Sequence, residues 1–128
     1  MQRRLLVKQS QSSWDDIRHF NKEEFACPCC GKDDIDMDFV NRLDEARNLS
    51  GIAYKINSGV RCEKHNKEVG STSRNHLDRK AADISALTGY VRGRILRGLY
   101  GAGFRRIGIS KTFIHVDSMD RPASCWLY

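Results

Sequence analysis

The chain has 128 residues, of which 40% are hydrophobic and 30% charged, a composition typical of a small globular domain rather than a disordered chain. No apolar run approaches the roughly 20 residues that cross a bilayer, so the sequence predicts no membrane insertion. The formal charge of +6 fits nucleic acid, acidic lipid or anionic cell-wall polymers, but a mildly basic solvated surface is the simpler explanation.

The N-terminal segment is expected to be an irregular lead-in. Leu5–Val7, the apolar stretch behind the basic start, is too short for a secretory signal, so we expect the protein to be made in the cytoplasm. Residues 11–35 show no clear periodicity, and their expected contacts with the core are Trp14, Phe20 and Phe25. We expect a single domain over residues 1–128, with the lead-in at 1–20 and the core from about residue 20 onward.

The five cysteines are an unusual feature for this length. Cys27, Cys29 and Cys30 lie in the segment CPCCG, whereas Cys62 and Cys125 are distant in sequence. An odd number argues against a fully paired disulfide framework. CPCCG resembles half of a zinc knuckle, but no second CxxC or CxxH follows at finger spacing. Reduced, mostly buried thiols are the first interpretation, and a structural zinc site or a disulfide are the alternatives.

The next segments predict helix, strand and short helix. From Asp36, apolar residues recur three and four positions apart, and Gly51 supplies a C-terminal stop. Residues 52–59 alternate like a half-buried strand. Residues 62–69 fit a short helix that ends at Gly70.

The C-terminal half continues the alternation of strands and helices. Residues 80–85 form a compact strand candidate, and Thr88 is placed to cap a helix that ends at residues 101–103. Three strands are expected after that helix: an antiparallel pair at residues 104–110 and 112–118, and a short strand at residues 125–128. The whole pattern predicts one alternating α+β unit.

Two of the four histidines fall in informative positions. In the predicted strand FIHVD, alternation would place His115 and Asp117 on one face, with Ile114 and Val116 on the other. His76 lies in a loop, seven residues before Asp83, which falls in the strand candidate at residues 80–85. Two imidazoles and a carboxylate supply three of the four positions that zinc prefers and leave one open for water. Taken singly, each histidine fits an ordinary surface or core position better than a metal site.

Several ordered motifs surround these histidines: Ser58-Gly59-Val60-Arg61, Asn66, His76 to Ile84, and His115-Val116-Asp117. In this order they resemble the motifs of the zinc D-Ala-D-Ala carboxypeptidase family of peptidoglycan peptidases, which shares its metal-site fold with hedgehog domains. A branch found in phages and prophages carries two further motifs, seen here at Glu24 to Gly31 and at Pro122 to Tyr128. The resemblance therefore runs from about residue 20 to the end.

The resemblance implies a small antiparallel sheet that carries the zinc site, with helices packed on it. It implies that His76, Asp83 and His115 bind a catalytic Zn²⁺ and that Arg61 is a catalytic residue that holds the substrate. Arginine offers a fixed fork of donors that suits a terminal carboxylate or a peptide carbonyl. A surface salt bridge is the alternative role for Arg61, and Asn66 is expected to be a structural hydrogen-bonding residue.

The sequence departs from the family pattern at two positions. Arg79 stands where the family usually has glycine, three residues after the first metal histidine. Glycine there permits a positive φ angle, so we expect this turn to be rebuilt. Arg74 replaces a frequent serine two residues before His76. Neither change removes a metal ligand, but both bear on the fit of the substrate.

The general base is less clearly indicated. Related branches place an acidic residue three positions before the last metal histidine, or a histidine two positions before it, and these positions hold Thr112 and Phe113. Asp117, two residues after His115, is the remaining nearby carboxylate. It is a candidate for catalytic proton transfer, and its alternative role is to orient the His115 imidazole.

The sequence thus predicts a zinc metallopeptidase, with D-Ala-D-Ala carboxypeptidase or endopeptidase activity on stem or cross-link peptides of bacterial peptidoglycan. We expect a monomeric phage or prophage lysis enzyme that reaches the cell wall after the host membrane is breached. The first rival is a non-catalytic, zinc-bearing binding domain on the same fold. The second, a nucleic-acid-binding protein built around CPCCG, is disfavoured because a second CxxC is missing.

Overall fold

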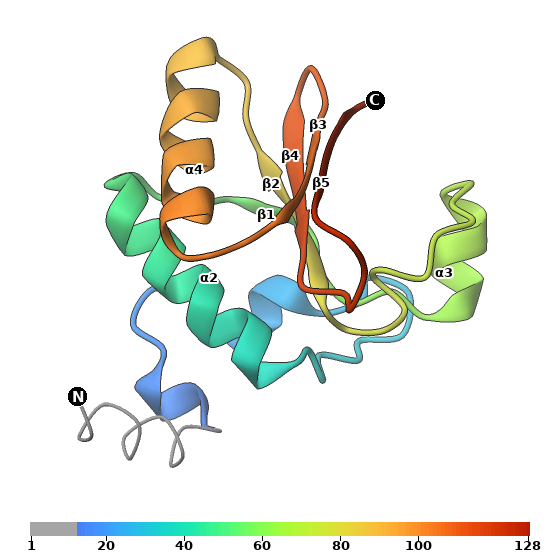
Figure 1. Cartoon of the computed structure of the whole chain (residues 1–128). Coiled ribbons are helices and arrows are strands. Elements are labelled where there is room, and N and C mark those ends of the chain that lie inside the picture. Colours follow the sequence, from blue (N-terminus) through green and yellow to red (C-terminus); the bar gives the residue numbers. More distant parts are fainter. Residues whose placement is uncertain (1–12) are drawn as a thin grey trace.

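The protein is described here from a computed structural model, which covers residues 13–128 (Figure 1). Residues 1–12, which include most of the expected lead-in, lie outside the described part of the chain. The elements in chain order are η1 (Trp14–Asp16), η2 (Lys22–Phe25), α2 (Met37–Ser50), β1 (Ile56–Ser58), α3 (Glu63–Glu68), β2 (Ala81–Ser85), α4 (Gly89–Gly101), β3 (Arg106–Ile109), β4 (Phe113–Asp117) and β5 (Ser124–Leu127). These elements confirm the α+β prediction.

The five strands form a single sheet in the order β1-β2-β4-β3-β5. Neighbouring strands are antiparallel except for β3 and β5, which run parallel. The expectation of a purely antiparallel sheet was therefore wrong. After β4 the chain passes beyond β3 to reach the free edge of the sheet, so β5 runs in the direction of β3 rather than against it.

The two faces of the sheet differ in chemistry. Ile84 on β2 and Ile114 and Val116 on β4 are completely buried in the core. Helices α2 and α4 lie together on one side of the sheet, whereas α3 lies on the other (Figure 1). Because side chains alternate along a strand, His115 and Asp117 face away from this core. The predicted separation of polar and apolar faces in FIHVD is thus confirmed.

The helix boundaries follow from capping residues. The Asp36 side chain accepts a hydrogen bond from the Phe39 N–H at the start of α2, and Gly51 ends that helix with φ +72°. Thr88 caps α4 in the same way through the Val91 N–H. Both helix predictions from the sequence are therefore confirmed.

The predicted strand at residues 52–59 is shorter than expected. Ile56–Ser58 pairs with β2, and the Ser85 N–H at the end of β2 donates one further hydrogen bond to the Lys55 carbonyl at 2.9 Å. Tyr54 is nevertheless buried, and its hydroxyl lies 2.6 Å from Ser50 Oγ at the end of α2. The alternating pattern at 52–56 thus reports side-chain burial rather than sheet pairing.

The segment before α2 covers the edge of the core with aromatic residues. Phe20 and Phe25 are buried with their rings 5.4 Å apart, and Trp14 packs against Phe25 at 5.9 Å. All three predicted contact residues therefore pack on or in the core. Within residues 13–128, no helix is long and apolar enough to cross a membrane.

Candidate metal centre

His76, Asp83 and His115 meet on the polar face of the sheet. Asp83 on β2 and His115 on β4 are direct partners in the antiparallel register, and His76 reaches them from the loop before β2. One ligand atom from each of the three residues lies within 4.8 Å of the other two. The structure therefore brings together the three ligands that the resemblance implied.

The His76 ring is held by the backbone. Its Nδ1 lies 2.8 Å from the carbonyl oxygen of Gly59, and His76 is only 3% exposed. Because a carbonyl oxygen can only accept, Nδ1 donates this hydrogen bond. The lone pair of the neutral ring is then on Nε2, which faces Asp83 Oδ1 at 3.4 Å. This arrangement prepares Nε2 to bind a cation.

The two nitrogens of the His115 ring have roles opposite to those of the His76 nitrogens. Its Nε2 lies 2.7 Å from Asp117 Oδ2, and its Nδ1 lies 3.0 Å from Asp83 Oδ1. Donation from Nε2 to Asp117 leaves the Nδ1 lone pair directed at the shared ligand position. Asp117 therefore lies on the far side of the imidazole from Asp83.

Asp117 is itself fully engaged. Its side chain is 0% exposed, and Oδ1 accepts hydrogen bonds from Arg106 Nε at 2.7 Å and from the Met119 N–H at 3.1 Å. Burial raises the pKa of Asp117, but hydrogen bonds from His115 and Arg106 outweigh burial and lower it. Of the two roles considered for Asp117, these contacts favour orientation of the imidazole.

The charges of the centre suit a cation. Burial lowers the pKa of His115, but hydrogen bonds to Asp117 and Asp83 outweigh burial and raise it. Burial likewise raises the pKa of Asp83, and hydrogen bonds from both histidines bring it well below the usual range. The groups around Asp83 and His115 thus favour a positive charge between the candidate ligands. Together with two imidazoles and one carboxylate as donors, this fits Zn²⁺.

Arg61 lies beside the centre and is held by three side chains. One guanidinium nitrogen lies 3.3 Å from Asp83 Oδ2. Nε donates to Ser58 Oγ at 3.1 Å, and the other guanidinium nitrogen donates to Asn66 Oδ1 at 3.1 Å. Asn66 is buried and donates to two backbone carbonyls of the following loop, which agrees with the structural role expected for it. Arg61 is therefore both close to the ligands and fixed in direction.

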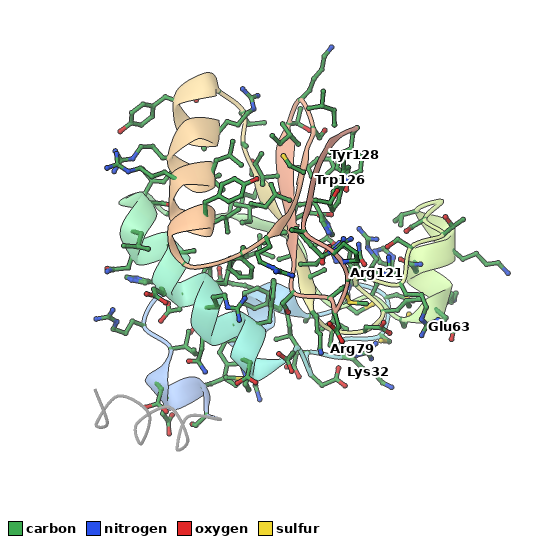
Figure 2. All side chains as sticks on the ribbon, in the orientation of Figure 1. Lys32, Glu63, Arg79, Arg121, Trp126 and Tyr128 are labelled. Atoms are coloured by element: carbon green, nitrogen blue, oxygen red, sulfur yellow. The ribbon has the colours of Figure 1, made fainter. Side chains whose placement is uncertain are left out.

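Trp126 is a site residue that the sequence analysis missed. Its ring centroid lies 5.5 Å from that of His115, and the Arg106 guanidinium lies over the same ring at 5.3 Å. Trp126 on β5 and Tyr128 just after it project to the side away from α4, as Figure 2 shows. CWLY was predicted as a strand, but its position beside β3 follows from a sheet order that the sequence does not reveal. Asn75, whose amide nitrogen lies 3.4 Å from His115 Nε2, was missed as well.

Arg79, in the turn after His76, has a positive φ angle. Its φ of +65° is the left-handed conformation that glycine adopts with ease. Arginine therefore makes this turn in a conformation that is strained for a residue with a side chain. The Arg79 side chain donates to the Leu77 carbonyl at 2.6 Å and to Asp34 at 3.1 Å, and the bond to the Leu77 carbonyl helps to offset the strain.

No disulfide joins the five cysteines, and only Cys27 is buried. Cys29, Cys30 and Cys125 are exposed, so the interpretation of mostly buried thiols was wrong. Cys62 lies with its sulfur 3.8 Å from that of Cys27.

Comparison with known proteins places this geometry in a family. No curated protein matches the chain. A sequence model described as Peptidase M15 matches residues 18–117, a range that contains all three candidate ligands, Arg61 and Asp117. Since the match spans most of the chain, the protein belongs to the peptidase M15 family.

Proposed function

We propose that the protein is a zinc-dependent peptidase that cleaves peptide bonds in the stem or cross-link of bacterial peptidoglycan. The observation that carries the proposal is the group formed by His76, Asp83 and His115, whose ligand atoms all lie within 4.8 Å of one another. Both imidazoles in this group are oriented by a hydrogen bond on the opposite nitrogen. Membership of the peptidase M15 family supports a metallopeptidase.

These three side chains would hold Zn²⁺ and leave a fourth position open. When bound there, Zn²⁺ supplies an activated water and polarises the carbonyl of the scissile bond. The protein's own contribution begins with the direction of the ligands. Gly59 and Asp117 each fix one imidazole, so the ligand nitrogens are arranged before the ion binds.

Arg61 is proposed to hold the substrate. Its hydrogen bonds to Ser58, Asn66 and Asp83 use one N–H on each guanidinium nitrogen, whereas a guanidinium carries five N–H groups. The remaining donors can bind a terminal carboxylate or a peptide carbonyl of the stem peptide. A carbonyl held at this point would lie next to the metal ligands, where negative charge develops during hydrolysis.

Asp117 is proposed to act through His115. Its contacts with His115, Arg106 and Met119 occupy both carboxylate oxygens, which suits a positioning residue better than a base. Arg106 maintains the negative charge on Asp117 and so strengthens its hydrogen bond to the imidazole.

We further propose that the protein acts as a monomer in phage or prophage lysis and reaches the wall after the membrane has been breached. The net charge of +6 would favour contact with anionic wall polymers, and raised ionic strength should then weaken lysis. Lysis that is unchanged by salt would contradict this use of the charge.

Digestion of purified peptidoglycan, followed by mass spectrometry of the products, tests the peptidase. Free D-alanine would identify a carboxypeptidase, and separation of cross-linked or stem peptides would identify an endopeptidase. His115→Ala removes one ligand and is the matched control. Identical product profiles for the two proteins would overturn the proposal.

A non-catalytic zinc-bearing binding domain is the second candidate. Two observations favour it: Thr112 stands where related branches carry an acid, and both oxygens of Asp117 are engaged. This candidate predicts a protein that holds zinc and binds muropeptides but releases no product. Zinc analysis together with the digestion experiment separates the two functions.

A further inference from the structure

Three cysteines gather at a second place in the molecule. Cys27 and Cys30 belong to the turn before α2, and Cys62 immediately precedes α3. Their sulfur atoms all lie within 4.8 Å of one another, and those of Cys27 and Cys62 are 3.8 Å apart. The residues come from segments more than thirty positions apart in sequence, so the fold rather than the local motif brings them together.

The turn around Cys27 has the geometry of a metal-binding knuckle. The Gly31 N–H donates to the Cys27 carbonyl at 2.7 Å, and the Cys27 N–H donates to the Lys32 carbonyl at 2.8 Å. Gly31 adopts φ +79°, which a residue with a side chain adopts only with strain. The chain thereby reverses direction between Cys27 and Lys32, and the thiols of Cys27 and Cys30 both lie near Cys62.

A backbone N–H is directed at one of the three sulfur atoms. The His65 N–H donates to Cys62 Sγ at 3.4 Å. Such a donor stabilises the thiolate, which is the form that binds metals.

We propose that Cys27, Cys30 and Cys62 form a second, structural metal site, separate from the His76, Asp83 and His115 centre. Soft thiolate ligands select Zn²⁺ among the common divalent ions. A structural zinc site takes four ligands, and Cys29, which lies in the same CPCCG segment, is the candidate for the fourth position.

The cysteine site lies next to the segment that supports the His76, Asp83 and His115 centre. Cys62 directly follows Arg61, and the Val60 N–H donates to the Phe25 carbonyl at 2.8 Å. At Gly59 a side chain would meet the Phe25 backbone at 2.8 Å, so the two segments are in direct contact there. A metal at the cysteines fastens the N-terminal turn to the segment that carries both Arg61 and the Gly59 carbonyl.

Titration of the reduced, metal-free full chain with Co²⁺ tests the site. Cobalt bound by thiolates gives an intense near-ultraviolet charge-transfer band, which imidazole and carboxylate ligands do not give. We expect this band in the wild-type protein and in His115→Ala, and its loss in Cys30→Ser. Cys125→Ser is the matched control, because Cys125 is also exposed but lies on β5, and it should keep the band.

Zinc analysis gives a second readout that does not depend on activity. The wild type should retain one more Zn²⁺ per chain than Cys30→Ser, and His115→Ala should keep the cysteine-bound ion. Failure of the peptidase proposal would leave these results unchanged. Absence of the band in the reduced wild type would overturn the metal site, as would isolation of the protein with a Cys27–Cys62 disulfide.

Discussion

Gly108 on β3 and Trp126 on β5 are direct partners in the parallel register, and the indole of Trp126 lies where a Gly108 side chain would be. A Cβ atom at Gly108 would come within 2.5 Å of Trp126 Nε1. Gly108 also pairs with His115 across β3 and β4. Because Gly108 has no side chain, the indole of Trp126 can lie over β3 with its ring beside His115 of the metal centre.

Gly108→Ala should displace Trp126 and impair turnover without removing a metal ligand. We expect kcat/KM on peptidoglycan to fall by roughly 10- to 100-fold, since displacement by about 1 Å at a site can have an effect of this size. In a Trp14→Phe background, the fluorescence of Trp126 should change as its environment changes.

Gly93→Ala on α4 is the control for this experiment, because nothing lies within 4 Å of a Cβ atom there. It should leave activity and fluorescence unchanged. An unaltered kcat/KM in Gly108→Ala would mean that the position of the Trp126 indole has no part in the reaction.

Asp117→Asn distinguishes orientation of His115 from proton transfer. If Asp117 orients the imidazole, loss of its charge should weaken Zn²⁺ affinity by roughly 10- to 100-fold, and excess zinc should restore much of the activity. Competition with a chelator measures the affinity, and kcat is measured at saturating zinc. A normal zinc affinity with kcat lost at every zinc concentration would instead identify Asp117 as the base.

Arg61→Lys tests whether the guanidinium fork holds the substrate. Lysine retains the charge but cannot reproduce the bonds to Ser58, Asn66 and Asp83 together. We expect kcat/KM to fall by roughly 10- to 100-fold, in line with ~1.5–3 kcal/mol for hydrogen bonds to a charged group. Zinc content should be preserved, because Arg61 supplies no metal ligand. A variant with wild-type kinetics would reduce Arg61 to an ordinary ion pair with Asp83.

The local features of the fold were predictable from the sequence because short-range chemistry determines them. Asp36 and Gly51 mark the ends of α2, and Thr88 marks the start of α4, since caps act within one turn of the helix. The opposite faces of FIHVD followed from strand alternation alone. The proximity of His76 to His115 was implied by family motifs and not by spacing.

Long-range pairing was the part that could not be predicted. The parallel β3–β5 contact depends on a crossing of the chain, and nothing local in CWLY indicates which strand it joins. Trp126 was missed for this reason. The approach of Cys62 to Cys27 was equally hidden, because it depends on how the N-terminal turn docks beside β1.

Arg79 offers a test of backbone strain that does not involve catalysis. A residue with a side chain pays about 1–2 kcal/mol in the left-handed conformation, whereas glycine adopts it freely. Arg79→Gly and Arg79→Ala both remove the bonds to Leu77 and Asp34, and they differ chiefly in this backbone term. We therefore expect the free energy of unfolding of Arg79→Gly to exceed that of Arg79→Ala by about 1 kcal/mol, as measured by urea denaturation. Equal stability of the glycine and alanine variants would show that the turn does not hold this residue at a positive φ angle in solution.

Asp34→Ala is the control for the loss of the Arg79 side-chain contacts. The salt bridge between Arg79 and Asp34 is partly exposed and should contribute little, so the free energy of unfolding of Asp34→Ala should lie close to that of the wild type.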